Sequence, residues 1–311
     1  MSSGKTKLIF RIAALVVLSV ALIILWLRSK SNEPSYHGRS LSQWLDQLDD
    51  GTAQWGVQWS TLPKKTAEQL EAAEAIRAIG TNAIPSLLKG LYVTDSFFYD
   101  KKEELLDYLK STREHLMSPA QLTRWKSALA LEALGPLAEP SAPELEKILI
   151  TENSMTGSGK EAAYVLGGMG PKGISILTNA VQAGTDWAVT CALWSLGQHP
   201  TRATNLISFL AALTAHTNLN YAYSSIWVLG EIHGHPRKVV PALLASLHDP
   251  RSNVRAFAAM ALRRHGAEAK EALPELNEFL SDTAIAGEVE LAIGDIELSI
   301  RMAEKTKASL K

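Results

Sequence analysis

The sequence predicts an all-α protein: a right-handed α-α superhelix of about six to seven helical hairpins, preceded by a single transmembrane helix. Three observations predict this architecture. From residue 67 onward, a unit of two apolar helices separated by a glycine recurs. The apolar residues follow helical spacing, and residues 12–27 contain no charged side chain. We find no stretch with the apolar and polar alternation that indicates a strand.

The first 27 residues predict a membrane anchor. Residues 1–7 are short and basic, and residues 8–27 form an apolar run of bilayer length, with Arg11 near its start and Trp26 near its end. Ser29-Lys30-Ser31 matches a signal-peptidase site only in residue size, so we expect an uncleaved anchor. The flanking basic residues favour a cytoplasmic N-terminus and a repeat domain on the extracytoplasmic side.

The charge balance disfavours nucleic acid as a partner. The chain has a formal net charge of −1, and residues 1–30 hold five basic and no acidic residues, which leaves 26 basic against 32 acidic residues in 31–311. A general nucleic-acid binder needs a basic surface, which this acidic body does not offer.

After a linker at 28–39, we expect an N-terminal capping segment at 40–66, with helical spacing in SLSQWLDQL, and then a repeat domain at 67–311. A helical insertion at 94–120 interrupts the repeat domain after its first unit. Each unit has an alanine-rich first helix, a glycine turn and a second helix that often opens with proline. The predicted turn glycines are Gly80, Gly135, Gly170, Gly197, Gly234 and Gly266, and the matching prolines are Pro85, Pro143, Pro241 and Pro274.

The stretch LGEIHGHPRKVVPALLASLHDPRSNVRAFAAMALRRHG, residues 229–266, closely resembles HEAT repeats, in the variety first described in phycobiliprotein lyases. The resemblance extends over about residues 67–281 and implies an α-solenoid. It implies little about function, because such repeats serve scaffolds, adaptors and a few enzymes.

Four histidines fall at or beside the predicted turns: His199, His233, His235 and His265. A metal site would require their ligand atoms to converge, whereas neighbouring hairpins stack about 10 Å apart. We therefore expect solvated turn histidines and no bound metal. Deoxyhypusine hydroxylase, an enzyme built of HEAT-like repeats, binds two irons through His-Glu dipeptides, and this sequence contains no such dipeptide.

Other motifs have structural interpretations. Cys191 has apolar neighbours and is expected in the core. SMTGSGKEA, residues 154–162, departs from the phosphate-binding loop pattern and is expected to be a loop before a helix. Trp187, Trp194 and Trp227 are expected to pack between hairpins, whereas Trp55 and Trp59 could cap the solenoid or form an exposed contact patch.

The predicted binding surface is a concave groove lined by the second helices. Counting from each proline or its equivalent, the positions not committed to the core should face this groove. The candidate protein-binding residues are Leu88, Lys89, Glu144, Lys147, Ile176, Asn179, Ile207, Ser208, Leu244, Asn277 and Glu278.

These observations favour a non-catalytic, membrane-anchored scaffold or adaptor that binds a protein or peptide through its concave face. We expect no catalytic residue, no cofactor and no metal. The alternatives are an enzyme of the lyase or metalloenzyme type, and an envelope ligand-binding protein that uses Trp55 and Trp59.

Overall fold

A computed structural model of the chain describes residues 33–49, 66–96, 117–152 and 157–309, together with Val17, Ser19, Tyr99 and Lys101. Apart from Val17 and Ser19, the predicted membrane segment at 8–27 lies outside these residues, as do Trp55, Trp59 and most of the insertion at 94–120. Among the residues that the structure does describe, no helix combines the length and the apolar character needed to cross a bilayer.

A small β-hairpin precedes the first described helix. Strands β1 (Ser35–Tyr36) and β2 (Arg39–Ser40) pair antiparallel, and His37 and Gly38 both have positive φ angles, of 50° and 77°. Two such residues form the tight turn that matches the twist of a hairpin. The expectation of a plain linker without strands is therefore wrong here, because only two residues pair on each side and leave no alternating pattern.

Helix α2 (Leu41–Leu48) follows directly and confirms the helix expected in the capping segment. The side chains of Leu41, Trp44 and Leu48 are buried, and Trp44 Nε1 donates to the Tyr36 carbonyl over 3.3 Å. This hydrogen bond attaches the β-hairpin to the helix.

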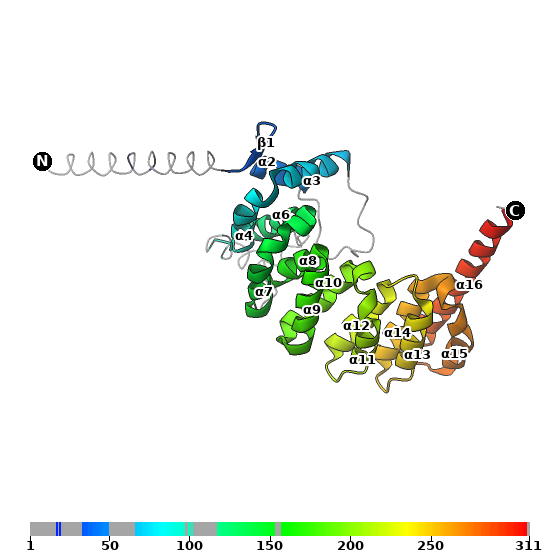
Figure 1. Cartoon of the computed structure of the whole chain (residues 1–311). Coiled ribbons are helices and arrows are strands. Elements are labelled where there is room, and N and C mark those ends of the chain that lie inside the picture. Colours follow the sequence, from blue (N-terminus) through cyan, green and yellow to red (C-terminus); the bar gives the residue numbers. More distant parts are fainter. Residues whose placement is uncertain are drawn as a thin grey trace, which may run out of the picture.

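The described residues then form six helical hairpins and a long final helix, which confirms the all-α solenoid (Figure 1). The hairpins pair α3 (Ala67–Ile79) with α4 (Ile84–Leu91), α6 (Pro119–Leu134) with α7 (Ala142–Thr151), α8 (Gly159–Met169) with α9 (Pro171–Ala183), α10 (Asp186–Gln198) with α11 (Ile207–Leu213), α12 (Leu219–Glu231) with α13 (Pro236–Leu247), and α14 (Ser252–His265) with α15 (Leu273–Glu278). The last helix is α16 (Ala286–Ser309). Short 3₁₀ turns link several of these helices: η2 (Gly80–Ala83), η3 (Gly135–Ser141), η4 (Pro200–Arg202), η5 (Thr204–Leu206), η6 (Gly266–Ala272) and η7 (Phe279–Ser281).

Sequence signals explain where the helices begin. Ser40, Thr66 and Ser118 form capping boxes with Gln43, Gln69 and Gln121: each hydroxyl accepts from the backbone N–H three residues on, and each glutamine oxygen accepts from the cap N–H. These contacts satisfy N–H groups that have no partner within the helix.

The turn glycines are confirmed at five of six predicted positions. Gly80, Gly135, Gly170, Gly234 and Gly266 have φ angles of 66°, 57°, 102°, 79° and 50°. Side chains with a Cβ avoid this left-handed region, so glycine fits there. The prediction is wrong for Gly197, which lies inside α10, whose C-cap is His199.

The proline prediction also needs one correction. Pro85, Pro143 and Pro274 stand in the first turn of their helices, as expected. Pro241 instead lies inside α13, because Pro236 occupies the first-turn position and starts the helix earlier.

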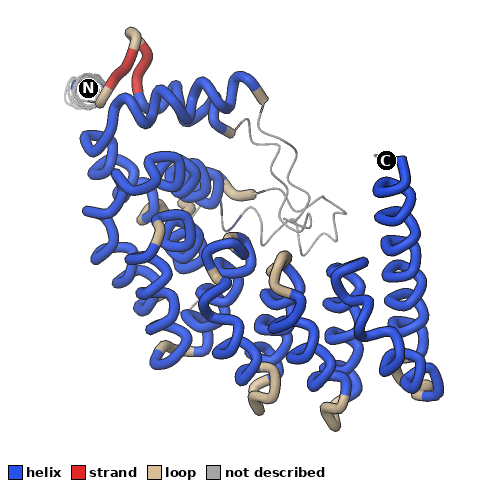
Figure 2. Tube along the Cα trace, turned by 45° about the vertical axis from the view of Figure 1, so that its right-hand side comes forward, coloured by secondary structure: helices blue, strands red, loops and turns tan. Residues whose placement is uncertain are grey.

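The hairpins stack into two rows that follow an arc (Figures 1 and 2). The first helices α6, α8, α10, α12 and α14 form the inner row, and the second helices form the outer row. Each inner helix packs extensively against the next one, whereas successive outer helices contact each other much less. The inner helices are packed closely and the outer helices are spread apart. The solenoid therefore curves toward its inner row.

Small residues on the inner helices allow this close packing. Ala162, Ala163 and Ala192 are fully buried. At Gly197 an added Cβ would come within 2.2 Å of the Trp227 ring, so the tryptophan of one helix packs directly on the glycine of the preceding one. This contact supports the expectation that Trp227 packs between hairpins. The core between the rows is filled by leucine, isoleucine and valine from both the first and the second helices, and Cys191 is buried, as expected.

Candidate functional site

The residues predicted to line a concave groove belong to helices of the outer row, so their placement on the inner curve is wrong. The alanine-rich first helices can approach each other more closely than the bulkier second helices, and they therefore occupy the inner curve. At the outer surface, Lys89, Lys147, Asn179, Ser208, Asn277 and Glu278 are exposed, and Leu88, Glu144, Ile176 and Leu244 are partly buried. The binding of a partner by these residues stays a prediction.

Ile207 is a further correction, because its side chain is only 3% exposed and belongs to the core. The turns η4 and η5 occupy residues 200–206, so α11 begins later than the repeat spacing predicts. The buried positions of this unit, Ile207 and Leu210, therefore fall about one residue later than a count of the core positions from the neighbouring repeats predicts.

The inner row presents a stripe of aromatic side chains along the concave surface. On α10, the partly exposed side chains Trp187, Thr190, Trp194 and Gln198 are three or four residues apart and therefore share one helix face. The helices α8, α9 and α12 pack against α10 on its other sides. This exposed face is consequently the one that borders the concave surface.

The same pattern continues on the next two inner helices. Trp227 is partly exposed on α12, and Phe257 and Met260 on α14 are 38% and 44% exposed. Tyr223 of α12 stacks on Phe257 with ring centroids 4.5 Å apart and an interplanar angle of 12°. The aromatic stripe therefore runs across three successive repeats.

Toward the N-terminal side the stripe reaches α8 and α6. The Tyr164 ring lies 6.1 Å from Trp194 and 5.2 Å from Trp125, and Lys160 Nζ lies 5.7 Å above the Trp194 ring. We call Tyr164, Trp194, Trp227, Phe257 and Met260 the concave stripe. A sequence signal was present, because these aromatic positions recur about once per repeat.

A hollow of about 970 Å³ lies along the turns of three repeats. Its walls include Gly168, Lys172 and Arg202. Arg202 Nη1 donates to the carbonyls of Gly167, over 3.0 Å, and Gly168, and Lys172 forms an ion pair with Glu139 at 3.7 Å. Both basic side chains are therefore already engaged within the protein.

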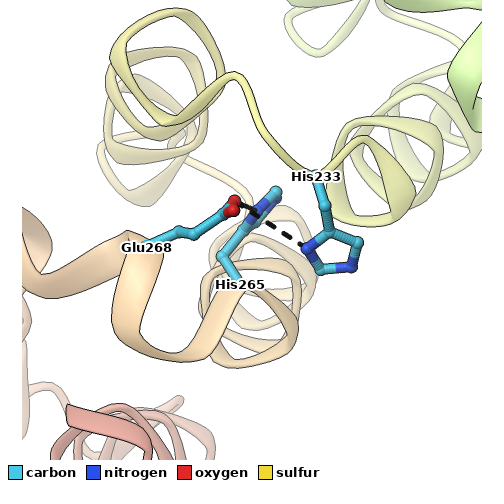
Figure 3. Close-up of side chains that lie close together, drawn as sticks. All are labelled: His233, His265 and Glu268. Carbon is cyan, nitrogen blue, oxygen red and sulfur yellow. Dashed lines mark ion pairs between the residues drawn. The ribbon is translucent and has the colours of Figure 1, made fainter. Parts of the chain in front are cut away.

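The turn histidines behave differently from the expectation. His233 and His265 come from adjacent repeats, and their ring centroids lie 5.0 Å apart (Figure 3). Glu268 joins them from η6, with its Oε2 3.9 Å from His233 Nδ1 and 3.6 Å from His265 Nδ1. The expectation that the turn histidines do not converge is therefore wrong for His233 and His265. Turns of neighbouring repeats come closer together than the axes of their helices, and the positive φ of Gly234 bends the chain there.

His265 is not solvated, contrary to the prediction. The residue is 4% exposed, and its Nε2 lies 3.0 Å from the Leu229 carbonyl oxygen of the preceding repeat. Burial, as the largest cause, lowers the pKa of His265. His199 is similarly placed two hairpins earlier, with Nε2 3.2 Å from the Tyr164 carbonyl oxygen and a pKa lowered by burial. At the turn between α12 and α13, His233 and His235 are exposed.

Cys191 and the described part of the loop at 154–162 both serve the packing of the solenoid. Burial raises the pKa of the Cys191 thiol to about 12, so it remains protonated at neutral pH. Helix α8 begins at Gly159, directly after Ser158, whose hydroxyl donates to the Leu91 carbonyl. This placement agrees with a loop before a helix in the described part of 154–162.

Comparison with known proteins supports the fold. The profile for HEAT repeats matches residues 206–293, and this match supports the HEAT-like helical solenoid that the described helices form. No curated protein sequence matches the chain.

Two solved structures are similar at low sequence identity. A crystal structure of an engineered protein is 17% identical over 84% of this chain and 80% of that one, with a TM-score of 0.36. Human deoxyhypusine hydroxylase in complex with glycerol is 16% identical over 83% of this chain and 96% of that one, with a TM-score of 0.34.

Proposed function

We propose that this HEAT-type solenoid is a non-catalytic scaffold that binds a protein partner along its concave surface and is held at a membrane by residues 8–27. The observation that carries the proposal is the concave stripe. Large apolar side chains that are left partly exposed on several neighbouring elements are typical of interaction surfaces. Aromatic residues and methionine are also enriched at the centres of such surfaces.

The spacing of the stripe favours an amphipathic helix as the partner element. Neighbouring helices of a packed row lie about 8–10 Å apart. A bound helix that crosses the row advances about 10 Å in seven residues, at roughly 1.5 Å per residue. One apolar residue in every seven could therefore contact Trp194, then Trp227, then Phe257 in turn.

Polar side chains beside the stripe suit the same kind of ligand. Lys160 lies beside Trp194, and Arg264 on α14 forms an ion pair with Glu231 on α12. Mixed charges at the edge of an apolar strip determine orientation and specificity more than affinity. The buried, protonated Cys191 thiol offers no nucleophile at neutral pH, which agrees with a binding role.

The membrane anchor rests on the sequence alone, because residues 8–27 lie outside the described residues, apart from Val17 and Ser19. Alkaline carbonate extraction of cell membranes tests the anchor, and we expect the chain to stay in the membrane fraction. Protease treatment of intact cells tests the proposed extracytoplasmic position of the repeats. Recovery of the chain in the soluble fraction would contradict the anchor.

Photo-crosslinking in native membranes, read by mass spectrometry, tests the binding surface. Met260→Asp places a charge in the concave stripe, and Leu280→Asp provides a matched control, because Leu280 follows α15 in the outer row and is 42% exposed against 44% for Met260. We expect Met260→Asp to lose the main crosslinked partner and Leu280→Asp to retain it. Equal recovery with both variants counts against the concave stripe, and loss with Leu280→Asp alone would favour the outer surface.

A further inference from the structure

His233, His265 and Glu268 bring three atoms that could bind a metal close together (Figure 3). One ligand-capable atom from each residue lies within 4.8 Å of the others. Among the described residues, this cluster is the sole group of three such side chains that meets this spacing. It joins the turn after α12 to η6, which follows α14 in the next repeat.

The orientation of His265 is fixed by its backbone contact. The Leu229 carbonyl can only accept a hydrogen bond, so His265 Nε2, 3.0 Å away, must carry the proton. The neutral ring then has its lone pair on Nδ1. That atom is buried and has no hydrogen-bond partner. A metal-binding histidine is typically held in this way, with one nitrogen donating to a carbonyl and the other free to coordinate.

Glu268 is also held in position. Its two carboxylate oxygens accept from the Gly234 N–H at 3.2 and 3.1 Å, and a second lone pair on each oxygen remains available. His233 is the most exposed of the three, with 53% of its side chain accessible. Its rotation can therefore adjust the geometry around two partners that the fold already holds.

We propose that His233, His265 and Glu268 bind one divalent transition-metal ion, best matched by zinc, which links the fifth and sixth hairpins. Two imidazole nitrogens and one carboxylate oxygen suit zinc and its neighbours, and not magnesium or calcium. Tetrahedral ligands at about 2.0–2.1 Å from zinc lie about 3.3 Å from one another. The separations of 3.6 and 3.9 Å between Glu268 and the two histidines close with shifts of a few tenths of an ångström, and the two histidine nitrogens, which lie within 4.8 Å, approach each other when His233 rotates. Three protein ligands leave the fourth position to water or to a side chain of a partner.

This site is independent of the proposed function, because it lies at the turns and the concave stripe lies on the inner helices. Bound metal would tie two repeats together and stabilise the folded state.

The test uses the purified full chain in detergent, stripped with a chelator and titrated with zinc chloride by calorimetry. We expect saturable binding of one zinc per chain and a higher Tm with zinc present. His233→Ala and Glu268→Gln should each weaken binding by at least about 10-fold. His235→Ala is the matched control, because His235 is an exposed histidine of the same turn outside the cluster, and it should bind as the wild type does.

A second variant separates coordination from folding. In His265→Gln the amide N–H can still donate to the Leu229 carbonyl, while the Nδ1 lone pair is removed. We expect this variant to keep the metal-free Tm close to that of the wild type and to lose zinc binding. The visible absorption of added Co²⁺, which is intense only at low coordination number, should be lost with it.

Several results would overturn the proposal. They are a wild type that binds no zinc, His233→Ala and Glu268→Gln variants that bind as tightly as the wild type, or an equal loss in His235→Ala. If partner crosslinking fails while zinc binds normally, the proposed function is wrong and the metal site stands.

Discussion

The inner and outer rows of the solenoid are built from different kinds of residues, although both are rows of short helices. The inner helices α8, α10 and α12 meet through alanine and glycine, and their aromatic side chains pack on the backbone of the neighbouring helix, as Trp227 does on Gly197. The outer helices contribute large aliphatic side chains to the core and touch each other little. The difference teaches that small residues set the curvature, whereas large residues supply most of the apolar burial.

Removal of bulk from an outer helix should have the largest effect on stability. Leu243 of α13 is fully buried, and Leu243→Ala should lower the free energy of unfolding by about 2–5 kcal/mol, because a cavity remains. Urea denaturation of the full chain measures this. Leu280→Ala, at an exposed position beyond α15, should change it by no more than about 0.5 kcal/mol. A loss at Leu243 as small as that would contradict its place in the core.

Addition of bulk to an inner helix should have the next largest effect. The Cβ of Gly197→Ala would meet the Trp227 ring, so we expect a loss of about 1–3 kcal/mol in the free energy of unfolding. The same substitution at Gly294, in α16, meets nothing within 4 Å and should stabilise the protein by up to about 1 kcal/mol through helix propensity. If both variants changed the free energy of unfolding in the same direction, the packing of the inner row would be looser than described.

The pH dependence of stability tests the hydrogen bonds between inner helices. Burial lowers the pKa of His199 in the folded state, and Nε2 of its neutral ring hydrogen-bonds to the Tyr164 carbonyl. The unfolded chain therefore binds protons more readily as the pH falls through about 6.5. We expect the free energy of unfolding to decrease below pH 7 and the decrease to be smaller in His199→Gln. Denaturation curves at several pH values measure this, and identical slopes would exclude the contribution of His199.

The smallest effect should come from the outer surface charges. Lys172 and Glu139 are half exposed and 3.7 Å apart. We expect Lys172→Ala to change the free energy of unfolding by no more than about 0.5 kcal/mol, because solvent screens such pairs. A larger loss in urea denaturation would show that the outer row depends on its ion pairs.

Much of the fold could be predicted because its signals are local. Five turn glycines with positive φ and three first-turn prolines stand where the sequence predicted them. The prediction was wrong at Gly197, which resembles a turn glycine in sequence but provides space for Trp227. A glycine that relieves backbone strain and one that makes room for a neighbour look the same in a sequence.

The candidate sites were harder to predict, because they depend on contacts between repeats. Ile207 was placed at the surface by counting, but two extra 3₁₀ turns shift its helix and bury it. Trp194 and Trp227 were expected to pack between hairpins. Their place on the concave surface could not be predicted without knowing which row of helices forms the inner curve. His233 and His265 belong to different repeats, and only their stacking brings them to Glu268.

The sequence by itself determined that short apolar helices alternate with glycine and proline turns, because helical periodicity and turn chemistry act within a few residues. The tertiary structure alone decided which helices form the inner curve and which turn histidines meet. Both depend on how closely successive repeats can approach, and that distance is set by side chains about 30 residues apart that touch only after the hairpins have stacked.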